Sequence, residues 1–164
     1  MNSRGQNIDK VEASVIIGEQ RETHLIDYFK SLGIDLTKSK NKYKPYDFLI
    51  GNNKYNKVEL KSVNASSSKY DGVYIGVDKI AYYLYRKVKN ENMRFYLIYA
   101  FYNKNDETNT LNIEYKYIKV DFTKFIHDYK RIIYFNKKHI FIPVADLKPI
   151  KHFIKYAVSV NNIL

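Results

Sequence analysis

The beginning of the chain has the apolar spacing of an amphipathic helix. From about Ile8 to Leu32, apolar residues recur at intervals of about 3.6 positions, which places them on one helix face. Gly33 follows directly and is a typical helix stop. Residues 37–45 are polar, rich in Lys and closed by Pro45. The pattern predicts one long helix followed by a basic loop.

Two short apolar runs separated by a turn come next. Tyr46 to Ile50 and Lys57 to Val63 have the composition and alternation expected of strands. The residues Gly51-Asn52-Asn53 between them favour a tight turn. We therefore predict a β-hairpin over residues 46–63.

The rest of the chain alternates strand-like and helix-like segments. The predicted order begins with a polar loop over 64–72, an apolar run over 73–77, a helix from an Asp78 N-cap to about Val88, a strand over 94–102, a polar loop over 103–110 and a strand over 111–120. A short helix from Asp121, the stretch Ile132 to Phe135, a strand over 139–144 and a final helix from Asp146 complete the chain. No repeat or linker divides the sequence. This order favours a single α/β domain over residues 1–164, built on a mixed sheet.

The charge balance changes the picture by suggesting a polyanionic partner. Lys and Arg total 28 against 17 Asp and Glu, a formal net charge of +11. An excess of this size is typical of proteins that bind nucleic acid. An A+T-rich genome would also enrich a chain in Lys, Asn, Ile and Tyr, so charge alone does not establish the partner.

Several protein classes are disfavoured by what the sequence lacks. It has no Cys, which excludes a disulfide scaffold, a thiolate metal site and a Cys nucleophile. No segment resembles a secretory signal or a membrane span. We therefore expect a cytoplasmic protein without a membrane partner.

The predicted hairpin carries two acids and a lysine that can act together. Residues two apart on a strand point to the same side, so Glu59 and Lys61 project together. Strand pairing can bring Asp47 beside Glu59. Carboxylates are ligands for Mg²⁺, which polarises a phosphate and lowers the pKa of a bound water. A nearby ammonium can orient that water or stabilise developing charge. The hairpin thus predicts metal-dependent hydrolysis of phosphodiester bonds.

An acid-x-Lys triplet carries little information by itself in a chain this rich in Lys. Four such triplets occur: Glu59-x-Lys61, Glu114-x-Lys116, Asp128-x-Lys130 and Asp146-x-Lys148. The last two fall in segments predicted as helical, where residues i and i+2 diverge. Glu114 lies on a predicted strand without a strand-borne acid just upstream. Only Glu59-x-Lys61 has an Asp on a partner strand across a tight turn.

Pro45-Tyr46-Asp47, eleven further residues and Glu59-Leu60-Lys61 together resemble the motif of the PD-(D/E)xK nuclease superfamily. Upstream, Gly18-Glu19-Gln20-Arg21-Glu22 resembles the first helix of that family. One departure is that Tyr46 separates the Pro from the Asp. The resemblance covers residues 18–102 well and the remainder in outline. It implies a restriction-endonuclease-like fold, a mixed β-sheet core flanked by helices with the motif on a central hairpin.

The resemblance also implies roles for these residues. Asp47 and Glu59 would be metal ligands together with the carbonyl of Leu60. Lys61 would lie beside the nucleophilic water. Glu22 would be a third carboxylate facing the site, with Glu19, one turn earlier, as its substitute. The implied cofactor is Mg²⁺, with Mn²⁺ tolerated.

The resemblance extends to small homodimeric type II restriction endonucleases, through Glu59-Leu60-Lys61-Ser62-Val63-Asn64, the chain length and the loop after the motif. It implies a site-specific hydrolase that cleaves double-stranded DNA as a homodimer. One alternative is a structure-selective nuclease, such as a Holliday-junction resolvase or a viral or phage DNA-processing nuclease, which shares the hairpin. Another is a basic DNA-binding module without catalysis.

Candidates for DNA contacts flank the motif. Small hydrogen-bonding side chains after the catalytic strand suit phosphates and base edges, and cations before Asp47 suit the backbone. The candidates are Ser62, Asn64, Ser66, Ser67, Ser68, Lys69, Tyr70, Lys42 and Lys44. Readings without a site role also remain open. Asp47 could be a surface acid beside a turn, and Glu59 and Lys61 could form a solvated strand face. Glu22 could lie on a solvent-facing helix stripe.

Overall fold

The computed structural model describes residues 3–153 except 42, 52, 106 and 109, with the backbone alone for residues 3–16. Its elements are α1 (Ser3–Ser31), β1 (Leu36–Lys38), β2 (Phe48–Ile50), β3 (Asn56–Val63), β4 (Gly72–Gly76), α2 (Val77–Lys89), β5 (Arg94–Asn105), β6 (Thr110–Lys119), the π-helix η1 (Lys124–Asp128), β7 (Arg131–Tyr134), β8 (Lys137–Pro143), the 3₁₀ helix η2 (Val144–Asp146) and β9 (Lys148–Pro149). A further helix begins at Ile150. None of the helices in the described part is long and apolar enough to cross a membrane.

The strands form a mixed sheet, as predicted, and a second, smaller sheet. The larger sheet has the order β1-β2-β3-β5-β6-β9, and the smaller has the order β4-β8-β7. β3 pairs with β5 in parallel, and the other neighbours in the larger sheet are antiparallel. The predicted hairpin is β2–β3, and β3 lies in the interior of the sheet.

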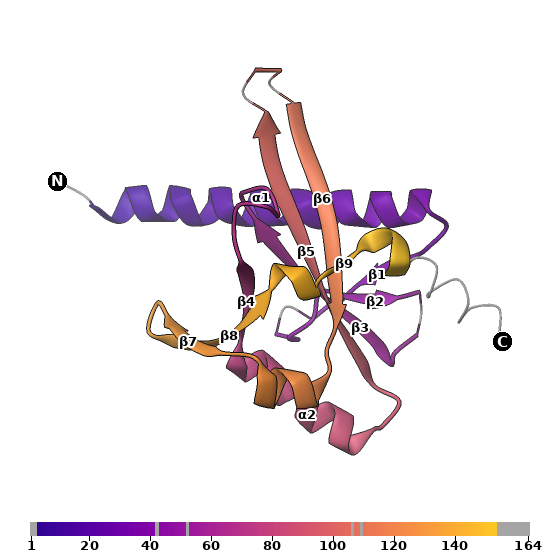
Figure 1. The fold of residues 1–164 in the computed structure, drawn as a ribbon. Helices are drawn as coiled ribbons and strands as arrows, with labels where there is room; N and C mark the ends of the chain where they lie inside the picture. Colours follow the sequence, from indigo (N-terminus) through magenta and orange to yellow (C-terminus); the bar gives the residue numbers. More distant parts are fainter. Residues whose placement is uncertain (1–2, 42, 52, 106, 109, 154–164) are drawn as a thin grey trace.

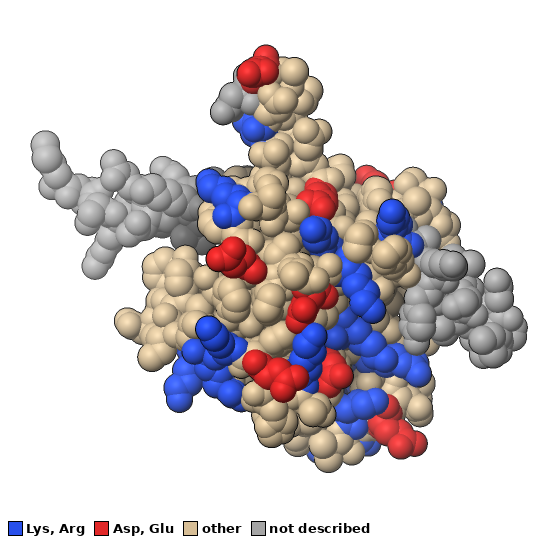
Figure 2. Space-filling view, viewed as in Figure 1, with Lys and Arg blue, Asp and Glu red and all other residues tan. Residues whose placement is uncertain are grey.

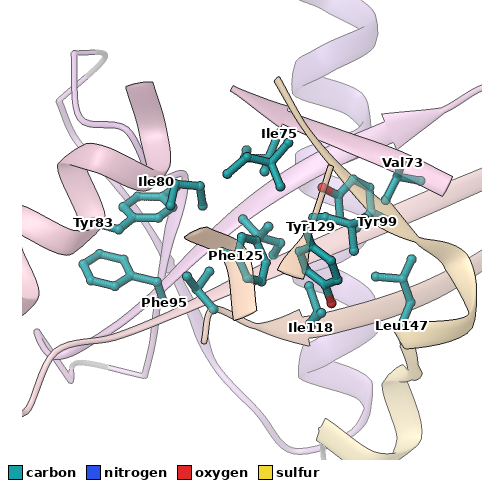
Figure 3. Packing of buried hydrophobic residues seen from close by; sticks show 14 of the residues in the cluster. Val73, Ile75, Ile80, Tyr83, Phe95, Tyr99, Ile118, Phe125, Tyr129 and Leu147 are labelled. Carbon is teal, nitrogen blue, oxygen red and sulfur yellow. The ribbon is translucent and has the colours of Figure 1, made fainter. Parts of the chain in front are cut away.

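Both faces of the larger sheet are covered (Figure 1). On one face, Leu25 and Phe29 of α1 pack with Phe153, Val58 and Ile98. On the other face, α2 and the smaller sheet cover an apolar cluster shown in Figure 3. Because β5 is buried on both faces, its central residues form a continuous apolar run instead of an alternating one.

The predicted end of the first helix is confirmed. Gly33 has φ +77°, and its N–H bonds the carbonyl of Lys30 while the N–H of Ile34 bonds that of Phe29. This is the glycine-terminated arrangement that satisfies the last carbonyls of a helix. The N-terminal part of α1 extends past the sheet in Figure 1.

Several local predictions are wrong. The predicted loop over 37–45 overlaps β1, a three-residue edge strand in which only Leu36 is buried, too short to produce a pattern. The hairpin strand begins at Phe48 and not at Tyr46. β5 and β6 run into the predicted loop over 103–110 and form a long hairpin that projects from the sheet (Figure 1). The N-cap of α2 is Gly76, and Asp78 lies in the first turn.

The two helices predicted in the last third of the chain have different outcomes. The short helix predicted from Asp121 is confirmed: Phe122 and Thr123 are helical ahead of η1, and the Asp121 carboxylate accepts a hydrogen bond from the Lys124 N–H. The final helix does not begin at Asp146. That residue ends η2, and β9 follows, pairing with β6, before a helix starts at Ile150. Lys130 and Lys148 therefore lie outside helices.

Candidate active site

The β2–β3 hairpin brings Asp47 and Glu59 together. Phe48 pairs with Val58, so one step further along the same register Asp47 lies opposite Glu59. The Asp47 N–H bonds the carbonyl of Val58 at 2.9 Å. Its carboxylate Oδ2 accepts the N–H of Leu60 at 2.8 Å. A side chain thus satisfies the Leu60 N–H where β2 has ended, and the carboxylate is held at the opening of the hairpin.

Glu59 is a buried carboxylate with two cationic neighbours. Its side chain is 2% exposed. The Nζ of Lys61 lies 2.8 Å from Glu59 Oε1, and the Nζ of Lys79, from α2, contacts the same oxygen. Glu59 Oε2 is buried and has no hydrogen-bond partner among the described residues. The alternative that Glu59 lies on a solvated strand face is therefore wrong, because α2 covers that face.

The proximity of the two acids raises the pKa of Asp47. Burial is the largest cause and the charge of Glu59 is the second. The Leu60 N–H and the charge of Lys79 act in the opposite direction but only partly offset them, so the pKa of Asp47 rises to about 6. Two carboxylates forced together in this way favour a bound proton or a cation between them.

Two buried tyrosines close the inner side of the site. The hydroxyl of Tyr83 donates to the Pro45 carbonyl at 2.6 Å, which ties the segment before Asp47 to α2. The hydroxyl of Tyr99 donates to the Tyr74 carbonyl at 3.1 Å. Burial, followed by the charge of Glu59, raises the pKa of both phenols. Both buried phenols are therefore close enough to Glu59 for its charge to act on them.

Lys79 is the site residue that the sequence analysis missed. It lies in the first turn of α2, more than a dozen residues from the motif, and no residue pattern connects it to Glu59. The packing of α2 against β4, whose last residue Gly76 directly precedes α2, directs it into the site.

We expect the Lys79→Met variant to lose stability in the absence of divalent cations. The buried carboxylate of Glu59 would keep only Lys61 as a cationic partner, and an incompletely paired buried charge costs about 1–3 kcal/mol. Urea unfolding in EDTA measures the loss. Lys124→Met, which breaks the more exposed pair with Asp146, is the matched control and should have a much smaller effect. Equal losses in both variants would contradict the role of Lys79.

Glu22 lies on the same side of the molecule as Asp47. Its Oε2 is 2.6 Å from the Nζ of Lys38, and this interaction raises the pKa of the Lys38 ammonium. The charge of Glu22 also contributes to the raised pKa of Asp47, after larger causes. Glu19 contributes less than Glu22 to the field at Lys38. The reading of Glu22 as a freely solvated helix residue is therefore not supported, and its role as a third carboxylate stays a prediction.

The donor set fits a hard divalent cation that retains water ligands. No group of three His, Asp or Glu side chains close enough to hold a metal occurs within the described part of the chain. The pair Asp47 and Glu59 nevertheless offers carboxylate oxygens, and the unpartnered Oε2 of Glu59 is a free ligand atom. Mg²⁺ is commonly held by one or two carboxylates, with waters and substrate phosphate completing the shell.

The predicted DNA contacts are split between two regions. Beyond the end of β3, Asn64 accepts a hydrogen bond from Arg21 of α1 at 2.6 Å, so α1 and this loop border one groove. Ser66 and Ser68 bond each other, and Lys69 lies over the ring of Tyr70. Ser62 is exposed and Ser67 half-buried. Lys44 is exposed on the α2 side, and Lys42 lies outside the described residues.

A basic cleft adjoins the site and was not predicted. Four cations line it: Lys44, Lys54, Lys57 and Arg86. Lys57 lies 4.1 Å from the centre of the Tyr46 ring, and the Arg86 Nε is buried without a hydrogen-bond partner among the described residues. A neighbouring hollow that shares Lys44 also includes Lys79. Lys and Arg gather in a band on the face shown in Figure 2. A cleft lined by cations is suited to the phosphates of a nucleic acid.

Comparisons with known proteins support the predicted fold. No protein-family model matches the sequence, and no curated protein is significantly similar to it. Among solved structures, the chain is similar to Hjc, a Holliday junction resolvase from Archaeoglobus fulgidus, with TM-score 0.53 and 12% identity over 84% of this chain and 95% of the other. It also matches D212, a nuclease from a fusselovirus, with TM-score 0.42 and 14% identity over 96% of this chain and 94% of the other. The chain thus shares the mixed α/β fold of the archaeal resolvase, which is the fold class predicted from the sequence.

Proposed function

We propose that this protein is a divalent-metal-dependent DNA endonuclease that recognises the structure of its DNA substrate. The observation that carries the proposal is the buried Glu59, paired with Lys61 and Lys79, opposite Asp47 on the same hairpin. Burying this group of charges is costly for folding. Catalysis gives a reason to keep this group of charges, since acids with perturbed pKa values cluster at functional sites.

The residues of the site have distinct tasks in this proposal. Asp47 and Glu59 hold Mg²⁺, with the Leu60 carbonyl as a further ligand, and Mn²⁺ is an acceptable substitute. When bound, the metal polarises the phosphate and makes a bound water more acidic. Lys61, the more exposed of the two lysines, orients the attacking water and stabilises the charge that develops on the phosphate. Lys79 holds Glu59 in position, and the basic cleft binds the DNA backbone.

A structure-selective nuclease is the better-supported reading of the substrate. The fold match to a Holliday junction resolvase covers almost the whole of that chain and so favours a branched DNA substrate. The type II restriction endonuclease predicted from the sequence uses the same hairpin and remains the second candidate. Both require cleavage of two strands related by symmetry, so we propose a homodimer. Light scattering in solution measures this directly.

Cleavage assays on three substrates test the proposal. The substrates are a mixed-sequence plasmid, a linear duplex and a four-way junction, each with Mg²⁺ and with EDTA. We expect cleavage of the junction at the branch point, with the linear duplex left intact. Lys61→Ala should abolish this cleavage, whereas Lys116→Ala, in the matched Glu114-x-Lys116 triplet on β6, should not.

Other outcomes are equally informative. Discrete plasmid bands that depend on Mg²⁺ and Lys61 would favour the restriction enzyme over the structure-selective nuclease. Binding without cleavage of any of the three substrates would contradict both and leave a basic DNA-binding module.

A further inference from the structure

An aromatic hairpin tip projects from the smaller sheet. β7 and β8 are joined by a two-residue turn at Phe135 and Asn136, and the flanking residues Tyr134 and Lys137 are paired. Phe135 is 83% exposed and Ile133 is 75% exposed. Figure 1 shows this turn pointing away from the rest of the molecule. Large apolar groups held in water in this way mark an interaction site.

The turn holds Phe135 in a conformation that its side chain disfavours. Phe135 has φ +46° and Asn136 has φ +57°. A type I′ hairpin turn requires positive φ at both central residues, which is why Asn and Gly usually occupy them. Asn136 follows this rule, but a bulky residue at positive φ is a true outlier. Phe135 thus combines an unfavourable backbone conformation with an unfavourable exposure of its ring to water. Backbone strain of this kind clusters at functional positions.

The chemistry around the tip favours nucleic acid over an apolar partner. Lys137 and Lys138 are exposed beside it, Lys130 and Arg131 are exposed at the other end of β7, and no acid occurs between residues 129 and 145. In Figure 2 an uncharged projection at the position of the tip adjoins a group of Lys and Arg side chains. An aromatic ring surrounded by cations can stack on a base while the cations bind neighbouring phosphates.

The smaller sheet fixes the tip relative to the site. Gly76, at the end of β4, pairs with His139 of β8, so the turn lies three residues beyond it, about 10 Å along the strand. α2, which carries Lys79, starts at the next residue. The adjoining residue Tyr134 is stacked on Tyr74 of β4. The tip is therefore held by the same sheet strand, β4, that leads directly into α2, the helix that carries Lys79.

We propose that Phe135 is a wedge that inserts between bases of the DNA substrate and stacks on the base it displaces. Apolar wedges of this kind unstack a base step and kink the duplex. The cost is lowest where bases are already incompletely stacked, as at a branch point. The wedge rests on the proposed DNA nuclease function and gives it a physical basis for preferring branched DNA over plain duplex.

Phe135→Asn tests this proposal, because it removes the ring and places at the turn a residue that tolerates positive φ. We expect its Tm to be equal to or higher than that of the wild type, which separates loss of function from loss of fold. The probe is a four-way junction with 2-aminopurine at the branch point, in EDTA so that cleavage plays no part. Wild type should raise the fluorescence several-fold, and the variant should not. Its affinity for plain duplex should stay within about threefold, while its preference for the junction falls about tenfold.

A control variant separates stacking by Phe135 from a general effect of exposed aromatic side chains. Tyr85→Ala removes an exposed aromatic residue of α2 and should leave the fluorescence response intact. An unchanged response in Phe135→Asn would overturn the wedge. So would conversion of a dimer into a monomer without loss of unstacking, which would make the tip an interface between copies. If the wild type unstacks the branch point but does not cleave DNA in Mg²⁺, the nuclease function is refuted and the wedge stands. If it cleaves DNA without unstacking the branch point, the wedge is refuted and the nuclease function stands.

Discussion

Glu59→Gln is expected to reduce DNA cleavage by at least about 10³-fold while DNA affinity stays within about threefold. The substitution keeps the size of the side chain but removes the charge that would hold the metal and face the two lysines. Lys61 and Lys79 are both partly exposed, so each can turn its ammonium toward water and the fold should survive. Single-turnover cleavage of the four-way junction and an electrophoretic binding assay measure the two quantities separately.

The chain offers a matched control for this substitution. Glu114 lies on β6 two residues before Lys116, and these residues form an ion pair with an N–O distance of 3.4 Å, but its side chain is half exposed. Glu114→Gln should cleave like the wild type. Loss of binding together with cleavage in Glu59→Gln would argue for a structural role, and unchanged cleavage would remove the hairpin from the mechanism.

Asp47→Asn is expected to make the metal-free protein more stable above pH 6 while also abolishing cleavage. The folded-state pKa of Asp47 is about 6, above its ordinary value of 3.8. A raised carboxyl pKa means that the stability present below pH 3.8 is lost as the pH rises through 6. The penalty at pH 8 is at most about 3 kcal/mol. Asparagine avoids it, and its amide oxygen can still accept the Leu60 N–H.

Thermal unfolding in EDTA at pH 4 and pH 8 measures this effect. For a chain of this size, Asp47→Asn should raise Tm by about 5–10 °C at pH 8 and by little at pH 4. Added Mg²⁺ should stabilise the wild type but not the variant, a readout that does not depend on activity. Asp146→Asn is a control of opposite sign, because Lys124, followed by Tyr129, lowers the pKa of that carboxyl. A lower Tm for Asp47→Asn at pH 8 would contradict the electrostatic account.

The central hairpin was predictable because the residues that specify it are close together in the sequence. Asp47 and Glu59-x-Lys61 flank one short turn, and the strand pattern sets the register that places the two acids opposite each other. The mixed sheet and the first helix were predictable for the same reason, from periodicity that spans many residues. The burial of Glu59 was not, since an alternating strand equally describes a half-solvated sheet.

The features that escaped prediction depend on tertiary packing. Lys79 reaches Glu59 only because α2 lies across the sheet, and the cleft of Lys44, Lys57 and Arg86 assembles from separate segments. Short elements such as β1 and β9 exist because a neighbouring strand supplies hydrogen bonds, which no local propensity encodes. Asp146 was mistaken for a helix start because an Asp is a common N-cap residue.

The two lysines around Glu59 would let the chain fold without the proposed cation. In small zinc domains the metal supplies the folding free energy, so the loaded protein is the only folded form. Here Lys61 and Lys79 already balance the buried charge. The proposed nuclease can therefore persist as a folded apoprotein and exchange its cation with the surroundings. The fraction of the protein that is active would then be set by the free cation concentration, and not by protein synthesis or maturation.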